Sequence, residues 1–290
     1  MRCGAALRPL AAAVDVFKRE IDAGALWGTK LLFGLTTLVF LGQLAANRRM
    51  LEQAPIAGVV LGGLSEMARF GAMSETLAAV RAEPLRLLSA VFVHFNGLHF
   101  AFNMLALAGF GRVAERGVGT ARFVIAYLVS GVVGFAAGVA VNELFGWTSF
   151  TGGASGAVFG MNGLILGWLF RTRDTRWGGI DKRWRWYALT TALYALLINL
   201  FPIKVNNSAH VGGLFCGAAL GFYYAARPRK GSFLVPNLGA LVGLVLAVAS
   251  FVMAQRAAGW GTRPDPRDVP SPLQGQDGPP EPEIEPDDMN

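Results

Sequence analysis

Long apolar stretches constrain this chain more than any other feature of its sequence. Seven of them approach the roughly 20 residues that an α-helix needs to cross the hydrocarbon core of a bilayer. They cover residues 31–46, 96–113, 123–141, 153–170, 187–201, 208–226 and 233–254. Residues 47–95 mix apolar pieces with Gly, Pro and charge, which predicts a loop with short helices at the membrane surface. The expected fold is therefore an all-α, polytopic bundle of membrane helices.

The composition agrees with a membrane protein. Of the 290 residues, 53% are hydrophobic and 16% are charged, whereas about a quarter of a soluble domain is charged. The net charge of +7 comes from short basic clusters between the apolar stretches, which is typical of membrane topology and argues against a nucleic-acid partner. Two cysteines, Cys3 and Cys216, are too few for a disulfide framework or a cysteine-built zinc site.

The distribution of lysine and arginine predicts the orientation. If the N-terminus is cytoplasmic, the inner segments hold seventeen of these residues and the outer segments nine. Because cytoplasmic loops carry the basic excess, we expect the N-terminus inside and the C-terminus outside. Charge interrupts the short apolar run near the N-terminus, so it is not a convincing signal peptide, and without a transit peptide a prokaryotic plasma membrane is the favoured location.

Four segments follow from this division. We expect a cytoplasmic N-terminal segment at residues 1–29, a six-helix core at residues 30–226 and a seventh transmembrane helix within residues 227–256. Residues 257–290 are acidic and rich in proline, a composition that favours disorder.

Ionisable groups within membrane spans are costly and therefore point to function. The three histidines, His94, His99 and His210, all lie in or at the mouth of an apolar span. None of the nineteen carboxylates falls in the middle of a span, which argues against an intramembrane aspartyl protease and a proton-coupled pump. His94 and His99 are five apart with no glutamate between them, so they do not form the HExxH pattern of a zinc protease, and we expect no metal. We expect a structural or water-facing role for His94.

After these exclusions, the sequence favours catalysis by a nucleophilic serine. Ser155 opens the fourth span within a Gly-Ala-Ser-Gly segment, and His210 lies near the start of the sixth. A serine hydroxyl becomes nucleophilic when a neighbouring imidazole takes its proton. The second, fourth and sixth spans all enter from outside, so at a rise of about 1.5 Å per residue His99, Ser155 and His210 share one shallow layer.

Glycine spacing predicts which spans meet. Small residues let helix backbones approach closely in a membrane. Such residues recur along the fourth and sixth spans, at Gly152, Gly156, Gly160, Gly163 and Gly167 and at Gly213, Gly217 and Gly221. Contact between these two faces would bring the Ser155 hydroxyl to the His210 ring. His99 and Asn103, four apart on one face of the second span, can point to the same place as donors to an oxyanion, together with the Ser155 amide.

These motifs, in this order, resemble the rhomboid family of intramembrane serine proteases over about residues 83–222. The resemblance rests on residues 86–94, His99 and Asn103, Glu115 and Gly119, Gly153-Ala-Ser155-Gly156, and His210-Val-Gly-Gly213-Leu-Phe-Cys-Gly217. It implies a rhomboid-like six-helix core with one added C-terminal helix. It also implies Ser155 as nucleophile, His210 as general base, and His99, Asn103 and the Ser155 amide as the oxyanion hole. Arg86 would belong to the surface-lying first loop, and Glu115 would be a structural polar anchor.

The chain departs from the family pattern at two positions. Rhomboids often have tryptophan before the arginine of the first loop, where this chain has Leu85, and many have tyrosine one turn after the serine, where it has Phe159. Leu85 concerns the packing of the loop, whereas Phe159 still offers an aromatic face that can orient the imidazole. Both catalytic groups are kept.

The sequence therefore predicts a Ser–His dyad endopeptidase that cuts single-span, membrane-anchored proteins near the outer interface, without cofactor. Taken singly, each residue has a plainer explanation, since serine and glycine ease helix packing and His99 and Asn103 could hold helices together. A catalytically inactive rhomboid-like protein that binds transmembrane clients is the main alternative, although the intact serine and histidine argue against it. A transporter would show pseudo-symmetric halves, and we find no convincing repeat. The substrate, the cleavage site and the oligomeric state do not follow from the sequence.

Overall fold

The computed structural model describes residues 26–47, 52, 64–172, 206–226, 241–249 and 252–253. The predicted fifth span at residues 187–201, most of the N-terminal segment and the C-terminal tail lie outside these residues.

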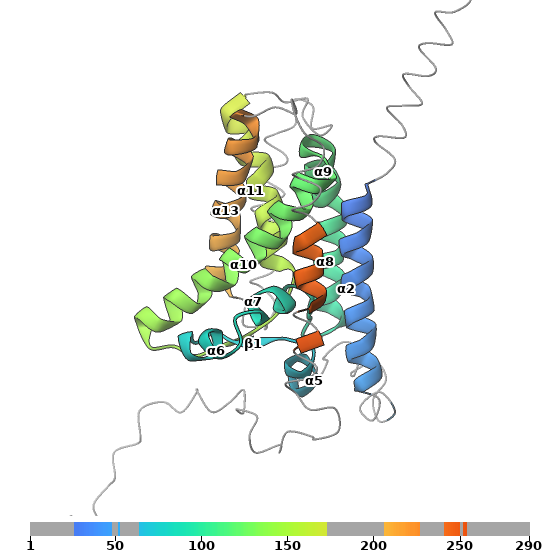
Figure 1. Ribbon diagram of the computed structural model, residues 1–290, viewed down its shortest axis with the longest axis vertical. Coiled ribbons are helices and arrows are strands. Elements are labelled where there is room, and N and C mark those ends of the chain that lie inside the picture. The colour runs from blue at the N-terminus through green and yellow to red at the C-terminus, as the bar shows by residue number, and fades with distance from the viewer. Residues whose placement is uncertain are drawn as a thin grey trace, which may run out of the picture.

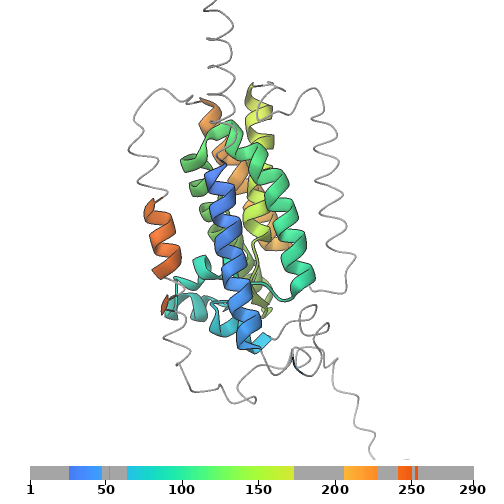
Figure 2. The same cartoon turned by 90° about the vertical axis from the view of Figure 1, so that its right-hand side faces the viewer.

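Long helices coincide with the other predicted spans (Figure 1). They are α2 (Trp27–Ala46), α10 (Thr120–Phe145), α11 (Ser155–Thr172), α13 (Asn207–Ala226), and the consecutive segments α8 (Gly97–Ala106), η2 (Leu107–Gly111) and α9 (Arg112–Val118). Residues 241–249 are helical as well and lie beside the bundle, where Gly243 faces Leu128 of α10 (Figure 2). The segment η2 is a π-helical turn within the second predicted span.

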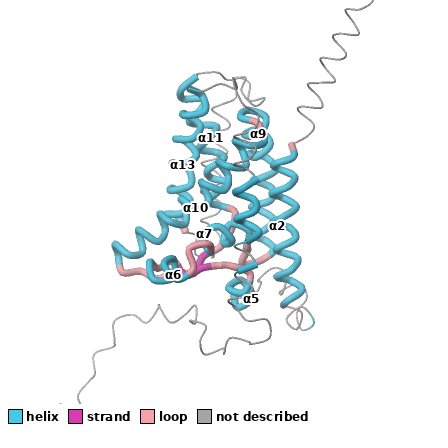
Figure 3. The backbone as a smooth tube through the Cα atoms, viewed as in Figure 1, coloured by secondary structure: helices cyan, strands magenta, loops and turns pink. Residues whose placement is uncertain are grey.

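Short elements fill the described part of the loop predicted at residues 47–95. They are α5 (Leu64–Arg69), β1 (Met73–Ser74), α6 (Leu77–Ala82), α7 (Arg86–Ser89) and the 3-10 turn η1 (Ala90–Phe92). Short helices were expected here, but β1 was not. It pairs antiparallel with β2 (Phe150–Thr151), and this small ribbon lies among the loops at one end of the bundle (Figure 3). The loop is thereby tied to the segment that leads into α11.

The long helices have the apolar exterior of membrane helices. By length and composition, α2 and α10 are long and apolar enough to cross a membrane, and the pair Arg86–Phe92 and Gly97–Val118, bent by 92°, adds a third if it forms one span. Large apolar side chains point outward along the helices, including Leu38, Leu105 and Phe215. An exposed apolar surface of this kind fits contact with lipid. The full number of spans stays a prediction.

Glu115 anchors the start of α2. Leu26, the residue before α2, has no side chain that can cap the first turn of the helix. The first backbone N–H groups of a helix also lack a carbonyl partner within the helix. The buried Glu115 carboxylate, on α9, accepts hydrogen bonds at 2.8 Å from the backbone N–H groups of Gly28 and Thr29. It also accepts from the hydroxyls of Thr29 and Thr120, each at 2.7 Å. A carboxylate at this end of a helix also interacts favourably with the helix dipole.

Glycines set the contact between α11 and α13. A Cβ atom at Gly213 would collide with the Gly156 carbonyl oxygen, one at Gly217 with that of Gly160, and one at Gly221 with that of Leu164. The two helices therefore touch backbone to backbone along the stripes that the sequence predicts, and they lie side by side in Figure 1. Helix α10 joins them through Gly134, where a Cβ would lie 2.6 Å from the Ala209 carbonyl oxygen.

We expect Gly217→Ala to lower the stability of the protein by about 1–3 kcal/mol, because the added methyl group forces α11 and α13 apart. Gly34→Ala, on α2, is the matched control. A Cβ at Gly34 meets nothing within 4 Å, so alanine there should be neutral or stabilise the helix by about 0.5–1 kcal/mol. Thermal unfolding in detergent micelles measures both changes. Equal stability of the two variants would contradict the backbone contact.

Candidate active site

Three of the predicted site residues lie in the first turn of their helices. Ser155 is the first residue of α11, His99 the third of α8 and His210 the fourth of α13. The two histidine-bearing helices each begin with an asparagine cap. The Asn96 side chain accepts from the His99 N–H at 2.8 Å, and the Asn206 side chain accepts from the Ala209 N–H at 2.9 Å. Each cap satisfies an otherwise unpaired backbone donor, which explains why the helices start at these residues.

The structure brings Ser155 and His210 into contact. The Ser155 Oγ and His210 Nε2 atoms are 2.7 Å apart, within hydrogen-bonding distance. The His210 ring is 5% exposed and stacks on Phe159, with ring centroids 4.5 Å apart and planes 19° from parallel. Phe159 lies one turn after Ser155 on α11. The same helix therefore supplies the hydroxyl and the aromatic surface that fixes the ring.

The turn before Ser155 is held by the first loop. The Gly153 N–H donates to the Ala90 carbonyl oxygen at 2.8 Å, next to the β1–β2 pairing. Gly153 has φ 144°, a backbone conformation that favours glycine. A Cβ atom there would also lie 2.7 Å from His99 Cε1, so glycine is required for space as well. The His99 ring consequently lies directly against the turn that leads to Ser155.

The two side chains predicted as oxyanion donors, His99 and Asn103, differ in their surroundings. Asn103 is fully buried, and its Nδ2 donates to the His99 carbonyl oxygen of its own helix at 2.9 Å. The Asn103 Oδ1 and His99 Nδ1 atoms are buried and have no hydrogen-bond partner within the described part of the chain. The structure thus places His99 against the Ser155 turn, whereas the hydrogen bond of Asn103 is made within α8 itself.

His94 is buried against α2 and α8. Its backbone makes a pair of 3.1 Å hydrogen bonds with the Gln43 side chain of α2, in which Gln43 Nε2 donates to its carbonyl oxygen and Gln43 Oε1 accepts from its N–H. Its ring is buried and packs edge-on against Phe40 and Phe100. Because His94 is 1% exposed, its ring does not face water, and a structural role is the expectation that remains.

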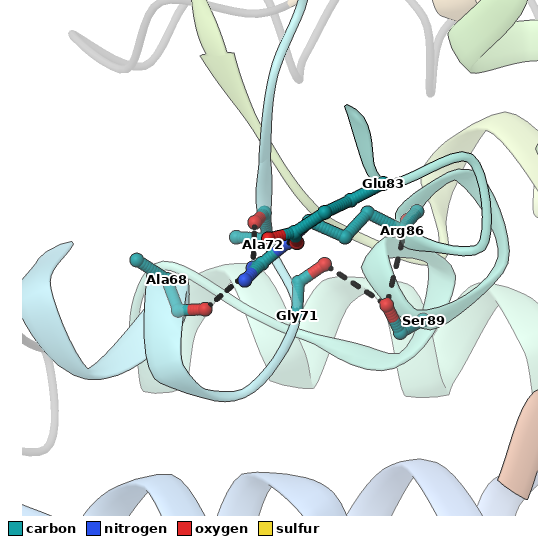
Figure 4. Close-up of polar contacts among 6 residues, drawn as sticks. All are labelled: Ala68, Gly71, Ala72, Glu83, Arg86 and Ser89. Atoms are coloured by element: carbon teal, nitrogen blue, oxygen red, sulfur yellow. Dashed lines mark hydrogen bonds and ion pairs between the residues drawn. The ribbon is translucent and has the colours of Figure 1, made fainter. Parts of the chain in front are cut away.

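Arg86 closes the first loop on itself. Its Nη1 donates to the carbonyl oxygens of Ala68 and Ala72 at 2.7 and 2.9 Å, and its guanidinium pairs with Glu83 (Figure 4). Ser89 adds a hydrogen bond to the Gly71 carbonyl oxygen at 3.1 Å. Arg86 therefore ties the ends of the segment that carries β1 to one another.

Sequence reasoning missed several polar residues around the site. Gln43, Glu75 and Asn142 are all buried, and each bonds a segment far away in the sequence. Asn206 carried a signal that could have been used, because asparagine is a preferred cap shortly before a predicted helix. Glu75 carried none, since it lies in a loop of mixed composition. Within the described residues no cluster of three or more His, Cys, Asp or Glu could hold a metal ion.

Comparison with known proteins identifies the family. The Rhomboid domain matches residues 81–227. The chain is 31% identical to RHOMBOID-like protein 1 of Arabidopsis thaliana over 198 residues, which are 67% of this chain and 47% of that protein. It is 34% identical to Rhomboid protease GluP of Bacillus subtilis over 187 residues, 62% of this chain and 33% of that protein. It is 31% identical to Rhomboid protease AarA of Providencia stuartii over 157 residues, 49% of this chain and 56% of that protein.

The chain thus spans between a third and just over half of the length of these relatives. The matched residues 81–227 contain the first-loop arginine, the helices α8, α9, α10, α11 and α13, and all of the predicted site residues described above. Apolar helices and this domain together make the chain an integral membrane protein. It belongs to the rhomboid family.

Proposed function

We propose that this chain is an intramembrane serine protease with Ser155 as nucleophile and His210 as general base. The family includes named proteases, which supports proteolytic activity at the level of the family. The observation that carries the proposal for this chain is the 2.7 Å contact between Ser155 Oγ and His210 Nε2. Proton transfer between a nucleophile and its base requires a separation of this size.

The contact supports a two-step acyl transfer. The Ser155 hydroxyl attacks the carbonyl carbon of the substrate while the His210 ring takes its proton at Nε2, and the ring then gives that proton to the departing amine nitrogen. A water molecule next attacks the ester formed on Ser155, with His210 again taking and returning the proton. The products are two peptide fragments and the free hydroxyl.

Three groups near the Ser155 turn can donate hydrogen bonds to the oxyanion that develops on the substrate carbonyl. The Ser155 N–H belongs to the first turn of α11, where backbone donors have no helical partner. The His99 ring lies against Gly153, two residues before the serine. The Asn103 side chain has a second amide hydrogen beyond the one that it gives to the His99 carbonyl. We propose these three groups as the oxyanion hole.

A dyad describes the site better than a triad. Among the described residues, Ser155 is the hydrogen-bond partner of the His210 ring and Phe159 its aromatic neighbour. The proposal therefore includes no carboxylate that orients His210, and stacking on Phe159 fixes the ring instead.

The proposals on substrate, chain segments and location rest on the sequence. Substrates would be single-span proteins cut near the outer interface, because the first turns that hold the three site residues lie at the outer face if the N-terminus is cytoplasmic. Residues 30–226 would form the six-helix core and residues 227–256 the seventh span. The favoured location is a prokaryotic plasma membrane.

Cleavage in liposomes tests the assignment of the two catalytic residues. We expect the wild-type protein to cut a reconstituted single-span substrate, and Ser155→Ala and His210→Ala to lose this activity while still unfolding cooperatively on heating. Ser208→Ala, a half-buried serine in the first turn of α13, is the matched control and should keep activity. A fluorophosphonate should label the wild type but not Ser155→Ala. Full activity in either catalytic variant would refute the dyad, and client binding without cleavage or labelling would favour the inactive alternative.

Stacking on Phe159 should influence reactivity. We expect Phe159→Leu, which keeps an apolar side chain but removes the aromatic face, to slow fluorophosphonate labelling of Ser155 by about three- to ten-fold, the equivalent of one aromatic pair. Phe159→Tyr keeps the face and should label within about two-fold of the wild-type rate. Wild-type labelling by Phe159→Leu would show that the ring is held in another way.

A further inference from the structure

Glu75 is a buried carboxylate that the proposed mechanism does not use. It follows β1 in the first loop and is 1% exposed. Its Oε2 accepts from Ser149 Oγ at 2.5 Å and from Asn142 Nδ2 at 3.5 Å, and its Oε1 accepts from Asn206 Nδ2. All of these partners are uncharged. Burial raises the pKa of the Glu75 carboxyl, and the hydrogen bonds from Ser149, Asn206, Thr151 and Asn142 oppose that shift.

Four segments meet at this carboxylate. Glu75 comes from the first loop, Asn142 from the end of α10, Ser149 from the segment that leads through β2 to Ser155, and Asn206 from the start of α13. Backbone bonds strengthen the junction, since the Glu75 N–H donates to the Ser149 carbonyl oxygen at 2.8 Å and Asn142 Nδ2 donates to the Glu75 carbonyl oxygen at 3.1 Å. Burying a charged group is costly unless it is hydrogen-bonded, and both oxygens of this carboxylate are.

Gly138 makes room for the contact between Glu75 and Asn206. A Cβ atom at this position of α10 would lie 2.5 Å from Glu75 Oε1 and 2.8 Å from Asn206 Nδ2. Any larger residue would therefore push the carboxylate and the amide away from their present positions. The helix surface, the carboxylate and the amide fit one another, which marks the pair as a specific contact between the loop and α13.

The Asn206 side chain uses both of its ends. Its Nδ2 donates to Glu75, while its Oδ1 accepts from the Ala209 N–H at 2.9 Å and its backbone carbonyl accepts from the His210 N–H at 3.2 Å. A flipped amide would present oxygen to the carboxylate and a donor to the helix N–H, so it would lose both side-chain contacts. Glu75 thereby selects the one amide orientation that caps the first turn of α13.

We propose that Glu75 is a positioning residue: by holding Asn206 it fixes the first turn of α13 and so places the His210 ring against Ser155. The inference rests on the proposed function, because its value for catalysis depends on His210 acting as the base. Glu75 does not touch the reacting atoms. Its second arm, through Ser149, holds the segment that leads to Ser155, so one side chain links the starts of both catalytic helices.

Substitutions that exchange the donor and the acceptor of the Glu75–Asn206 hydrogen bond test the proposal without changing the size of either side chain. In E75Q, the amide oxygen can keep accepting from Asn206 Nδ2 while the amide nitrogen donates to Ser149 Oγ, because a hydroxyl can accept as well as donate, so only the 3.5 Å contact with Asn142 is lost. In N206D, a second carboxylate faces Glu75, although aspartate still caps the helix. In the double variant E75Q/N206D, the amide nitrogen introduced at position 75 can donate to the carboxylate introduced at position 206, while the amide oxygen still accepts from Ser149. The bond is restored with its direction reversed.

We expect N206D to lower kcat by about ten- to a hundred-fold, as a small misplacement of a catalytic group does, with KM nearly unchanged, whereas E75Q alone should stay within about three-fold of the wild type. The double variant should recover to within about three-fold of the wild-type kcat. Glu143→Gln is the matched control. Glu143 is an exposed carboxylate next to Asn142, and it accepts from the Leu77 N–H of the first loop at 2.7 Å. Among the described residues it forms no hydrogen bond with α13, so the kcat of the Glu143→Gln variant should equal that of the wild type.

Hydrogen exchange of the peptide around Ala209 and His210 gives a second readout that needs no activity. Exchange there should be faster in N206D and return to the wild-type rate in the double variant. A double variant whose kcat stays as low as that of N206D, or N206D with wild-type kcat and exchange, would overturn the proposal. If the wild type neither cleaves nor labels, the protease function fails, and exchange alone then decides whether Glu75 fixes the start of α13.

Discussion

The close backbone contact between α11 and α13 is the constraint on which the candidate site depends. Two helices that meet through ordinary side chains lie about 8–10 Å apart, whereas glycines at Gly156, Gly160, Gly213 and Gly217 let carbonyl oxygens of one helix lie where side chains of the other would be. Within lipid, where apolar side chains gain little by leaving the solvent, such packing is what holds helices together. The short side chain of Ser155 reaches the His210 ring only because nothing bulky stands between the two backbones.

Hydrogen bonds from side chains fix helix ends and loops in this protein, whereas glycines set the contact along the middle of α11 and α13. Backbone groups at membrane depth must find partners within the protein. Glu115 supplies them for the start of α2, Gln43 for the backbone of His94, and Asn206 for the start of α13. The Glu115 and Gln43 bonds join α2 to other segments, whereas the Asn206 cap is local and its side chain joins the start of α13 to the first loop through Glu75.

The sequence revealed the parts of the site that are rare and local. Histidines in apolar stretches, a serine between glycines and a regular glycine stripe can be read without knowing the fold, and the structure brings Ser155, His210 and His99 to neighbouring first turns. The β1–β2 pairing and the buried position of Glu75 could not be read in this way. Glu75 and Asn206 are 131 residues apart, and a glutamate in a mixed loop is normally exposed. Its burial follows from the tertiary arrangement of four segments, which no local pattern encodes.

A base without a carboxylate partner, as proposed for His210, has a physical rationale in this environment. In a triad the carboxylate orients the imidazole and stabilises the imidazolium, but a permanent charge in a buried site carries a large desolvation penalty. A dyad creates its charges only during the reaction, when imidazolium and oxyanion form together as a pair of opposite sign and attract each other strongly because the site is poorly screened. Orientation can then come from uncharged contacts, here the stacking on Phe159 and the cap at Asn206. The buried carboxylate that joins this arrangement of contacts, Glu75, is held among neutral donors and acts on the helix instead of the ring.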